Sequence, residues 1–239
     1  LDYLIGAMKR AGKLPENPVA LKTIVTTEMA RKVAESNGVK CFDTFTGFKF
    51  MAEKKNALEA SGEGKVIFSY EESYGYMLGD YVRDKDAVTA SMLLTEMAAW
   101  YYAQGMTLFD ALNALYEKYG YYAEKTHNLV MPGLDGLRDM AKLMADLRAN
   151  PPTEISGVKV TVRKDYGSVI DCATGAKSRM ELSGSNVLRY ELADGTVILV
   201  RPSGTEPKIK VYILTQGADA AEAAANIEKY GRWVAALKP

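Results

Sequence analysis

The feature of this chain that most constrains its fold is the alternation of β-rich runs with helical segments over roughly its first half. Runs rich in β-branched and aromatic residues occur at 19–26, 39–44 and 65–70, and a helical segment follows each of them, after a long loop in the third case. Two parallel strands in one sheet need a long connection, which is usually a helix. The sequence therefore predicts an α/β domain with a mostly parallel sheet covered by helices over residues 1–150.

The last part of the chain has a different pattern. The consecutive prolines Pro151 and Pro152 stop a helical segment, and the apolar runs beyond them are short and close together. Asp194 and Gly195 lie between two of these runs, which is a strong signal for a β-hairpin. We therefore expect a boundary at the two prolines, followed over residues 153–239 by a smaller α+β domain with an antiparallel sheet.

Composition and charge exclude several classes of protein. The 239 residues include 30 basic and 30 acidic side chains, whereas a protein that binds nucleic acid usually has a basic excess. No apolar run approaches the roughly 20 residues that span a bilayer. Cys41 and Cys172 are far apart, which indicates neither a disulfide framework nor a cysteine metal site. These features predict a cytoplasmic protein with no nucleic-acid or membrane partner.

The segment at 201–208, RPSGTEPK, has the composition of an anion site. It offers two fixed positive charges, two hydroxyl donors and a glycine that lets backbone N–H groups converge, and a phosphate group would suit all of them. The same residue types are also typical of a proline-bracketed turn, so composition alone leaves both interpretations open. The residues concerned are Arg201, Ser203, Gly204, Thr205 and Lys208.

Two other segments follow predicted parallel strands. Ligands usually bind beyond the carboxyl ends of such strands, so the segments at 46–49 and 71–85 should share a crevice. Glu71, Glu72 and Ser73 offer carboxylates and a hydroxyl to vicinal sugar hydroxyls. Adjacent acids are equally an ordinary feature of a solvated loop, and the Thr-Gly pair at 46–47 is equally a turn before a helix.

Three acids between the third strand and the following helix raise the question of a metal site. Asp80, Asp84 and Asp86 could together hold a cation, but the run lacks the Gly-x5-Glu continuation of a calcium loop. Asp86 stands at a helix start, where a carboxylate accepts hydrogen bonds from exposed N–H groups. We expect an N-cap here and no metal ligands.

Taken in their order along the chain, these segments resemble the α-D-phosphohexomutase superfamily. RPSGTEPKIKVY is similar to its phosphate-binding loop, and YEESYGYMLGDYVRDKDAV to its sugar-binding loop as found in bacterial phosphoglucomutases and related phosphopentomutases. TGFKF is similar to the threonine-containing loop upstream. The resemblance covers essentially the whole chain, in register with the third and fourth domains of a four-domain family. One departure is Tyr70, where many relatives have glycine.

The resemblance implies roles for individual residues. Glu71 and Ser73 would contact sugar hydroxyls, and Thr46 would approach the sugar from the neighbouring loop. Lys85 and Arg83 would add positive charge near a bound bisphosphate. The residues implied to clamp the non-transferring phosphate are Arg201, Ser203, Gly204, Thr205 and Lys208. The resemblance also implies a TATA-box-binding-protein-like fold for the C-terminal domain.

Two loops of the family do not occur in this sequence. The family's phosphoryl carrier is a serine in a Ser-His-Asn-Pro-like loop, and its magnesium binds an Asp-Gly-Asp-x-Asp-Arg-like loop; neither string is present. Leu1, rather than methionine, opens a helical pattern. We therefore expect a C-terminal fragment that carries no catalytic residue and is inactive alone, its missing N-terminal domains being one partner and a sugar phosphate the other.

For the full-length parent the resemblance implies an isomerase of glucose metabolism. It would interconvert glucose 1-phosphate and glucose 6-phosphate through a phosphoserine and a bisphosphate intermediate, with Mg²⁺ and glucose 1,6-bisphosphate as cofactors. The alternatives are a phosphopentomutase or phosphomannomutase, a non-catalytic sugar-phosphate-binding module, and a purely structural pair of domains. The sugar preferred by the parent distinguishes the first two from a glucose enzyme.

Overall fold

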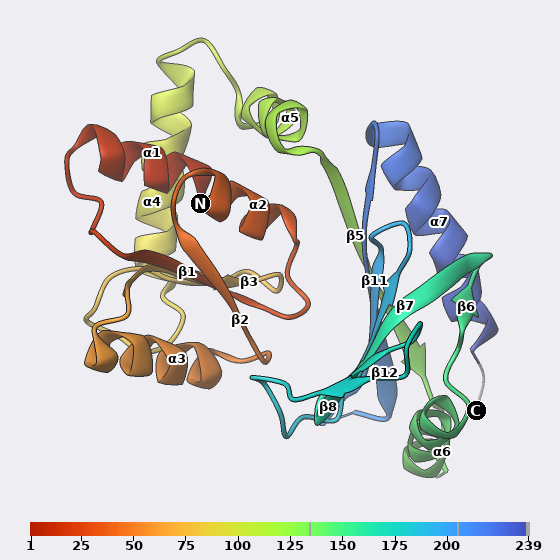
Figure 1. The fold of residues 1–239 in the computed structure, drawn as a ribbon. Helices are drawn as coiled ribbons and strands as arrows, with labels where there is room; N and C mark the ends of the chain where they lie inside the picture. The colour runs from red at the N-terminus through yellow and green to blue at the C-terminus, as the bar shows by residue number, and fades with distance from the viewer. Residues whose placement is uncertain (134, 205, 238–239) are drawn as a thin grey trace. The chain divides into compact units, whose positions relative to one another are not determined.

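The computed structural model describes residues 1–133, 135–204 and 206–237 and divides the chain into two compact units, Leu1–Gly120 and the part from Tyr121 onward (Figure 1). The first unit contains α1 (Asp2–Arg10), β1 (Pro18–Thr23), α2 (Met29–Ser36), β2 (Lys40–Thr44), α3 (Phe48–Ser61), β3 (Lys65–Glu71), β4 (Gly75–Met77), α4 (Ala87–Tyr102) and α5 (Leu108–Tyr119). The second contains β5 (Tyr121–Val130), α6 (Gly136–Ala149), β6 (Glu154–Ile155), β7 (Val158–Asp165), β8 (Ser168–Asp171), β9 (Lys177–Ser178), β10 (Leu188–Leu192), β11 (Val197–Pro202), β12 (Lys208–Gly217) and α7 (Ala220–Ala236).

The sheet of the first unit has the strand order β2-β1-β3-β4. Strand β1 pairs in parallel with both β2 and β3, and β4 returns antiparallel to β3. Helix α3 covers one face of the sheet, and α1 and α2 lie on the other (Figure 1). Every residue of β1 is buried, because this strand has a neighbour on each side and a helical layer on each face. The predicted α/β arrangement is confirmed.

Strand β3 contains one extra residue relative to β1. Val19 pairs with Val66, but Ala20 pairs with Phe68, so Ile67 forms a bulge. Val66 packs in the core beneath α3, whereas Phe68 and Tyr70 line an apolar pocket that α1 and α4 also border. The bulge therefore decides which side chains beyond it face α3.

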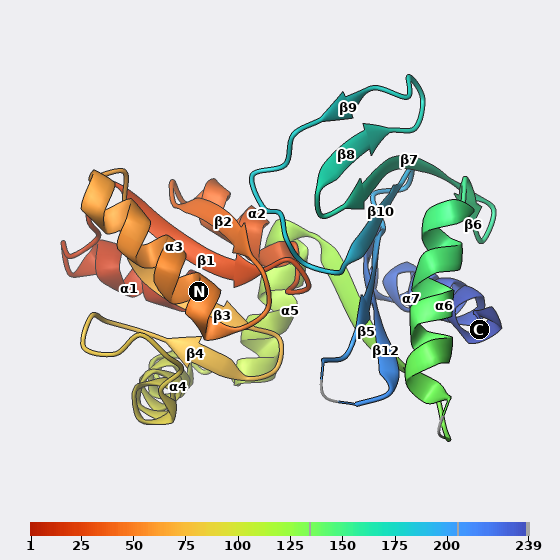
Figure 2. The same ribbon diagram turned by 90° about the horizontal axis from the view of Figure 1, so that it is seen from below.

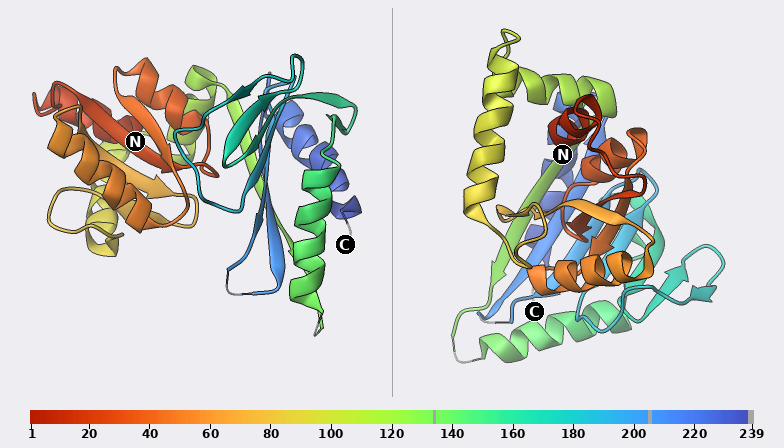
Figure 3. Two further views of the ribbon diagram at one scale, coloured as in Figure 1. Left: turned by 60° about the horizontal axis from the view of Figure 1, so that its bottom comes forward. Right: turned by 90° about the vertical axis from the view of Figure 1, so that its left-hand side faces the viewer.

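The sheet of the second unit is antiparallel, with the strand order β5-β12-β11-β10-β7-β8-β9 and β6 paired to β7. Helices α6 and α7 cover the same face of this sheet (Figures 2 and 3). The core lies between them and the sheet and includes Leu143, Tyr190, Ile198, Val211 and Tyr230. The predicted antiparallel α+β domain is confirmed.

The hairpin predicted from the Asp-Gly pair is also present. Strands β10 and β11 pair antiparallel with Leu188 opposite Val200. Gly195 occupies the turn with a φ of +84°, a conformation that glycine adopts without the steric cost of a side chain.

The boundary between the units differs from the predicted one. The division lies between Gly120 and Tyr121, about thirty residues before the proline pair at 151–152. Strand β5 belongs to the second sheet because it pairs with β12 from Lys208↔Val130 to Gly217↔Tyr121. Its partner lies some eighty residues further along the chain, so no local pattern reveals the pairing. The prolines instead end α6, which packs in the core of the second unit.

Side chains cap the first turns of α4 and α5. The Asp86 carboxylate accepts hydrogen bonds from the N–H groups of Val88 and Thr89, which confirms it as the N-cap of α4. Thr107 and Asp110 form the capping box of α5. Hydrogen bonds of this kind satisfy N–H groups that have no partner inside the helix.

Candidate functional site

The carboxyl ends of β1, β2 and β3 meet at one edge of the first sheet. Three connections leave this edge: residues 24–28 after β1, residues 45–47 after β2, and the turn 72–74 between β3 and β4. Thr46 lies half-buried in the second connection. Glu71 ends β3, and Ser73 lies exposed in the turn beyond it. The structure thus brings Thr46, Glu71 and Ser73 to the same edge of the sheet.

The turn after β3 is tightly formed. Glu71 pairs with Gly75 across the hairpin, which leaves a three-residue loop whose last member, Tyr74, has a φ of +66°. A Cβ atom on Gly75 would lie 2.5 Å from Cε2 of Phe48 and 3.0 Å from Oε1 of Glu71. Phe48 is the first residue of α3 and follows the Thr46-Gly47 pair directly. The close approach therefore holds the threonine loop and the turn against each other.

The two cations placed near this site by the resemblance lie in different surroundings. The Lys85 ammonium is 5.6 Å from the centre of the Phe48 ring and 3.3 Å from the Asp84 carboxylate. Arg83 instead donates from Nε to Oδ1 of Asn56 at 2.8 Å and from Nη1 to the carbonyl oxygen of Asp80 at 2.9 Å. Lys85 therefore lies with the candidate sugar-binding residues, whereas Arg83 is bound along α3.

Asp80, whose carbonyl oxygen accepts from Arg83, makes a pH dependence of the stability predictable. Hydrogen bonds from the ammonium groups of Lys55, at 2.8 Å, and Lys65, at 2.5 Å, lower the pKa of Asp80 from 3.8 to about 2. Because the pKa is lower in the folded chain, this carboxylate stabilises the fold above about pH 4, and the contribution disappears as the pH falls towards 2. The side chain is 53% exposed, so solvent screening limits the effect to about 1 kcal/mol.

The check on Asp80 is chemical unfolding of the wild type and of Asp80→Asn. We expect the wild type to be the more stable protein near neutral pH and the two to converge at about pH 2. A difference in the free energy of unfolding that is the same at both pH values would contradict the assignment.

The sequence reasoning missed a buried polar group at the end of β1. Lys22 is fully buried, and its ammonium lies 2.9 Å from Oδ1 of Asp43 and 3.1 Å from Oε1 of Glu28. Thr23 and Thr26 are also buried, and their hydroxyl oxygens are 2.8 Å apart. A lysine within the apolar run ALKTIV was the available signal, because a charged side chain in a central strand is rare unless it is paired.

In the second unit, the segment 201–208 connects β11 to β12. Arg201 stands directly opposite Lys210 in the antiparallel ladder, and Lys208 lies two residues before Lys210 in the same strand. These three cations consequently share the sheet face opposite to Ile209 and Val211, which pack in the core beneath the helices. Lys210 was not among the predicted residues, although the alternation in KIKVY places it on the same face as Lys208.

Lys208 and Arg201 differ in their partners. Lys208 forms an ion pair with Glu206, and this hydrogen bond lowers the pKa of the Glu206 carboxyl. Within the described ranges of the chain, neither Arg201 nor Lys210 forms an ion pair with a carboxylate, although the charge of Lys210 helps to lower the pKa of Glu206. Like charges placed opposite each other on neighbouring strands repel, so an anion bound between them would be stabilising.

The backbone of the loop is only partly available for an anion. The Ser203 N–H donates to the carbonyl oxygen of Lys208 at 2.9 Å, which closes the hairpin and removes that N–H from the expected cradle. Gly204 is exposed, with open space around its Cα atom. Thr205, which was predicted to bind phosphate, lies outside the described residues.

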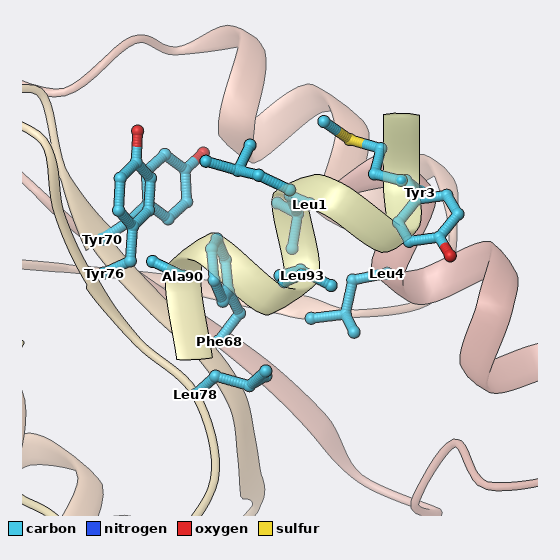
Figure 4. Close-up of a pocket in the computed structure, with 11 residues that line it drawn as sticks. Leu1, Tyr3, Leu4, Phe68, Tyr70, Tyr76, Leu78, Ala90 and Leu93 are labelled. Atoms are coloured by element: carbon cyan, nitrogen blue, oxygen red, sulfur yellow. The ribbon is translucent and has the colours of Figure 1, made fainter. Parts of the chain in front are cut away.

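An apolar pocket of about 150 Å³ lies in the first unit between α1, α4, β3 and β4 (Figure 4). The rings of Phe68, Tyr70 and Tyr76 line one side of it, with Leu4 and Leu93 opposite. No charged side chain lines this pocket, so it does not suit a sugar phosphate. It does explain how Tyr70 is tolerated, because its side chain points to the opposite face of β3 from that of Glu71.

The part of the chain that the structure describes shows neither a cluster of metal ligands nor a membrane-spanning helix. Within it, no group of three His, Cys, Asp or Glu side chains lies together as a metal ion requires. No helix there has the length and apolar character needed to cross a membrane.

Comparison with solved structures identifies the fold. The chain matches the open form of pp63/parafusin, a phosphoglucomutase from Paramecium, with a TM-score of 0.61 and 22% identity over 96% of this chain and 40% of that one. It also matches a phosphoglucomutase/phosphomannomutase family protein from Burkholderia thailandensis, with a TM-score of 0.55 and 19% identity over the whole of this chain and 42% of that one. Both units therefore have counterparts in proteins of known structure.

Comparison at the level of sequence is more specific. Residues 3–119 match the model of the phosphoglucomutase/phosphomannomutase alpha/beta/alpha domain III, and residues 128–229 match that of the C-terminal domain. The chain belongs to the phosphoglucomutase/phosphomannomutase family. A phosphoglucomutase from Staphylococcus aureus strain N315 is 36% identical over 209 residues, which make up 87% of this chain and 37% of that protein. The chain thus spans little more than a third of the length of the curated relatives it matches.

Proposed function

We propose that this chain supplies the substrate-binding half of a phosphoglucomutase that interconverts glucose 1-phosphate and glucose 6-phosphate. The 36% identity to a phosphoglucomutase supports the choice of enzyme. The observation that carries a phosphate-binding role is the pair Arg201 and Lys210, two cations opposite each other on one sheet face, neither of which forms an ion pair with a carboxylate among the described residues.

The first unit binds the sugar in this proposal. Among the residues that the structure describes, the side chains of Glu71 and Ser73 have no hydrogen-bond partner, so both are available to a ligand. The Glu71 carboxylate accepts hydrogen bonds from adjacent sugar hydroxyls, while the Ser73 hydroxyl both donates and accepts. Thr46 approaches from the neighbouring connection, and Lys85 adds positive charge near the same edge.

The second unit binds the phosphate that is not being transferred. Arg201 donates two parallel N–H groups to phosphate oxygens, which fixes their direction as well as their position. Lys208 and Lys210 add charge, and Ser203 and Thr205 supply hydroxyl groups. Because phosphoryl transfer depends mainly on positioning and electrostatic stabilisation, holding the non-reacting end of the substrate contributes directly to its rate.

The remaining parts of the reaction are expected outside this sequence. The family's phosphoserine loop and magnesium loop do not occur here. Since no suitable cluster of ligands is present among the described residues, these side chains do not suit Mg²⁺. Glucose 1,6-bisphosphate, as the intermediate, would use the same sugar and phosphate contacts as the substrates.

Calorimetric titration of this chain with glucose 1-phosphate and with inorganic phosphate tests the proposal. Hydrogen bonds to charged groups contribute about 1.5–3 kcal/mol, so Arg201→Ala should weaken both affinities by about tenfold to a hundredfold. Arg232→Ala is the matched control, because Arg232 is exposed on α7, which covers the opposite face of the sheet. Unchanged affinity in Arg201→Ala would rule out the phosphate site.

A parent enzyme specific for another sugar is the second candidate, since the family models cover phosphomannomutases as well. Comparing the binding of glucose, mannose and ribose phosphates separates these enzymes. Preference for ribose or mannose phosphate would replace the glucose assignment while leaving the phosphate site in place.

A further inference from the structure

Three side-chain oxygen atoms meet at the edge of the first sheet: one from the end of β1, one from the connection that follows it, and one from the turn after β3. The hydroxyl groups of Thr23 and Thr26 each donate to Oε2 of Glu72, both at 3.2 Å. The two hydroxyl oxygens are themselves 2.8 Å apart, and the two threonines are 0% and 2% exposed. A buried pair of hydroxyl groups therefore binds the carboxylate of an otherwise exposed turn residue.

The position of Glu72 makes this contact relevant to the candidate site. Glu72 lies between Glu71 and Ser73, the two side chains proposed to bind sugar hydroxyls. The ladder pair Glu71↔Gly75 fixes the base of the turn, and the contact of Glu72 with β1 fixes its tip. Because the base and the tip of the turn are both fixed, the backbone of Glu71 and Ser73 has little conformational freedom before a ligand binds.

The chemistry of the three atoms explains why hydroxyl groups are needed. The Thr23 hydroxyl oxygen also accepts a hydrogen bond from the Val25 N–H at 3.3 Å, which ties it to its own loop. An ionised carboxylate can only accept, so a hydrogen bond to Glu72 takes its proton from a threonine. The two hydroxyl groups have two protons for three contacts, so at any moment one of them donates either to Glu72 or to the other hydroxyl. Buried hydroxyl groups that lose their partner are costly, and this cost favours the docked position of the turn.

We propose that Thr23 and Thr26 are positioning residues that preset the sugar-binding turn through Glu72. The inference rests on the proposed function, because it assumes that Glu71 and Ser73 bind the sugar. Fixing a binding loop in advance removes the entropy cost of ordering it when the ligand binds. Loss of the hydrogen bonds from Thr23 and Thr26 to Glu72 weakens sugar binding without affecting the binding of phosphate by the second unit.

The test compares the affinities of glucose 1-phosphate and inorganic phosphate in Thr23→Val, Thr26→Val and Glu72→Ala. Each change should weaken glucose 1-phosphate binding by about tenfold and leave phosphate binding within about twofold. Thr23→Ser retains the hydroxyl and should restore the wild-type ratio. Thr27→Val is the matched control, because the Thr27 hydroxyl instead accepts from the Met29 N–H. Glu72 is exposed, so Glu72→Ala should fold. It therefore tests the contact with the threonines even if Thr23→Val or Thr26→Val fails to fold.

The outcomes separate this inference from the proposed function. If the wild-type chain binds glucose 1-phosphate no more tightly than inorganic phosphate, the sugar-binding role of the turn is wrong. If the wild type prefers glucose 1-phosphate and Glu72→Ala or the valine variants keep that preference, only the positioning role is overturned. A serine variant that behaves like the valine variant also contradicts it, because the hydroxyl group would then not be responsible.

Discussion

Replacing Lys22 by methionine should destabilise the first unit by about 3 kcal/mol, because it removes the fully buried one of two cations that a pair of partly buried carboxylates share. The Lys22 ammonium lies between Asp43 and Glu28 and also donates to the carbonyl oxygen of Thr26 at 3.2 Å. Methionine matches the volume of lysine but offers none of these groups a proton. Asp43 and Glu28 both keep their ion pairs with Arg31, at 2.7 Å and 3.2 Å, which limits the loss.

Urea unfolding followed by tryptophan fluorescence measures this effect. Trp100 lies in the first unit and Trp233 in the second, so a Trp233→Phe background makes the signal specific for the unit that contains Lys22. Lys32→Met is the control, because Lys32 is exposed on α2. If Lys22→Met and Lys32→Met shift the midpoint equally, the buried ion pairs do not stabilise the fold.

The second large effect is expected for Gly75→Ala. The new Cβ would lie 2.5 Å from Cε2 of Phe48, closer than real Cβ contacts allow, and Phe48 is only 4% exposed. Overpacking of this kind costs about 2 kcal/mol, and here the turn or the ring must shift. Because the turn carries Glu71 and Ser73, the affinity for glucose 1-phosphate should fall together with stability.

A double-mutant cycle with Phe48→Leu shows whether this contact is responsible. Leucine lacks the ring atom that the new Cβ would meet, so Gly75→Ala should cost less in the Phe48→Leu background than in the wild type. Residues in direct contact usually show a coupling energy of about 0.5–3 kcal/mol. Strictly additive effects would mean that the clash with Phe48 does not determine the cost.

Local patterns predicted most of the fold. The expected run at 65–70 and the expected helix start at Asp86 correspond closely to β3 and to the N-cap of α4, because period and capping residues are local properties of the sequence. Strands β4, β8 and β9 were missed. Each has four residues or fewer, which is too short for a periodic signal.

The domain boundary was the main structural error. A pair of prolines marks where a helix ends, but it does not show to which sheet the preceding elements belong. Strand β5 is assigned by its pairing with β12, which depends on contacts far apart in the sequence. Local breaks in the sequence therefore predict the ends of elements better than the limits of domains.

The candidate site residues that belong to a sequence motif were predictable, whereas the buried polar residues beside them were not. Thr46, Glu71 and Ser73 were found through their loops, and the structure brings them to one edge. Lys22 and Thr23 were missed because they lie inside a strand-like run, where their polarity has no local explanation. Only the neighbouring segments show what these side chains contact: Asp43 lies in β2, and Glu28 and Glu72 lie in the connections after β1 and β3.

The single extra residue in β3 has a consequence for what the edge of the sheet can bind. Side chains alternate between the two faces of a strand, so Ile67 sets the phase of every residue that follows it. If Ile67 were instead paired with Ala20 in a regular ladder, every later residue would shift by one, and Tyr70 and Glu71 would exchange faces. The edge would then present a phenol, and the carboxylate would be buried among leucines and aromatic rings. The bulge at Ile67 thus decides whether this edge of the sheet is acidic or apolar.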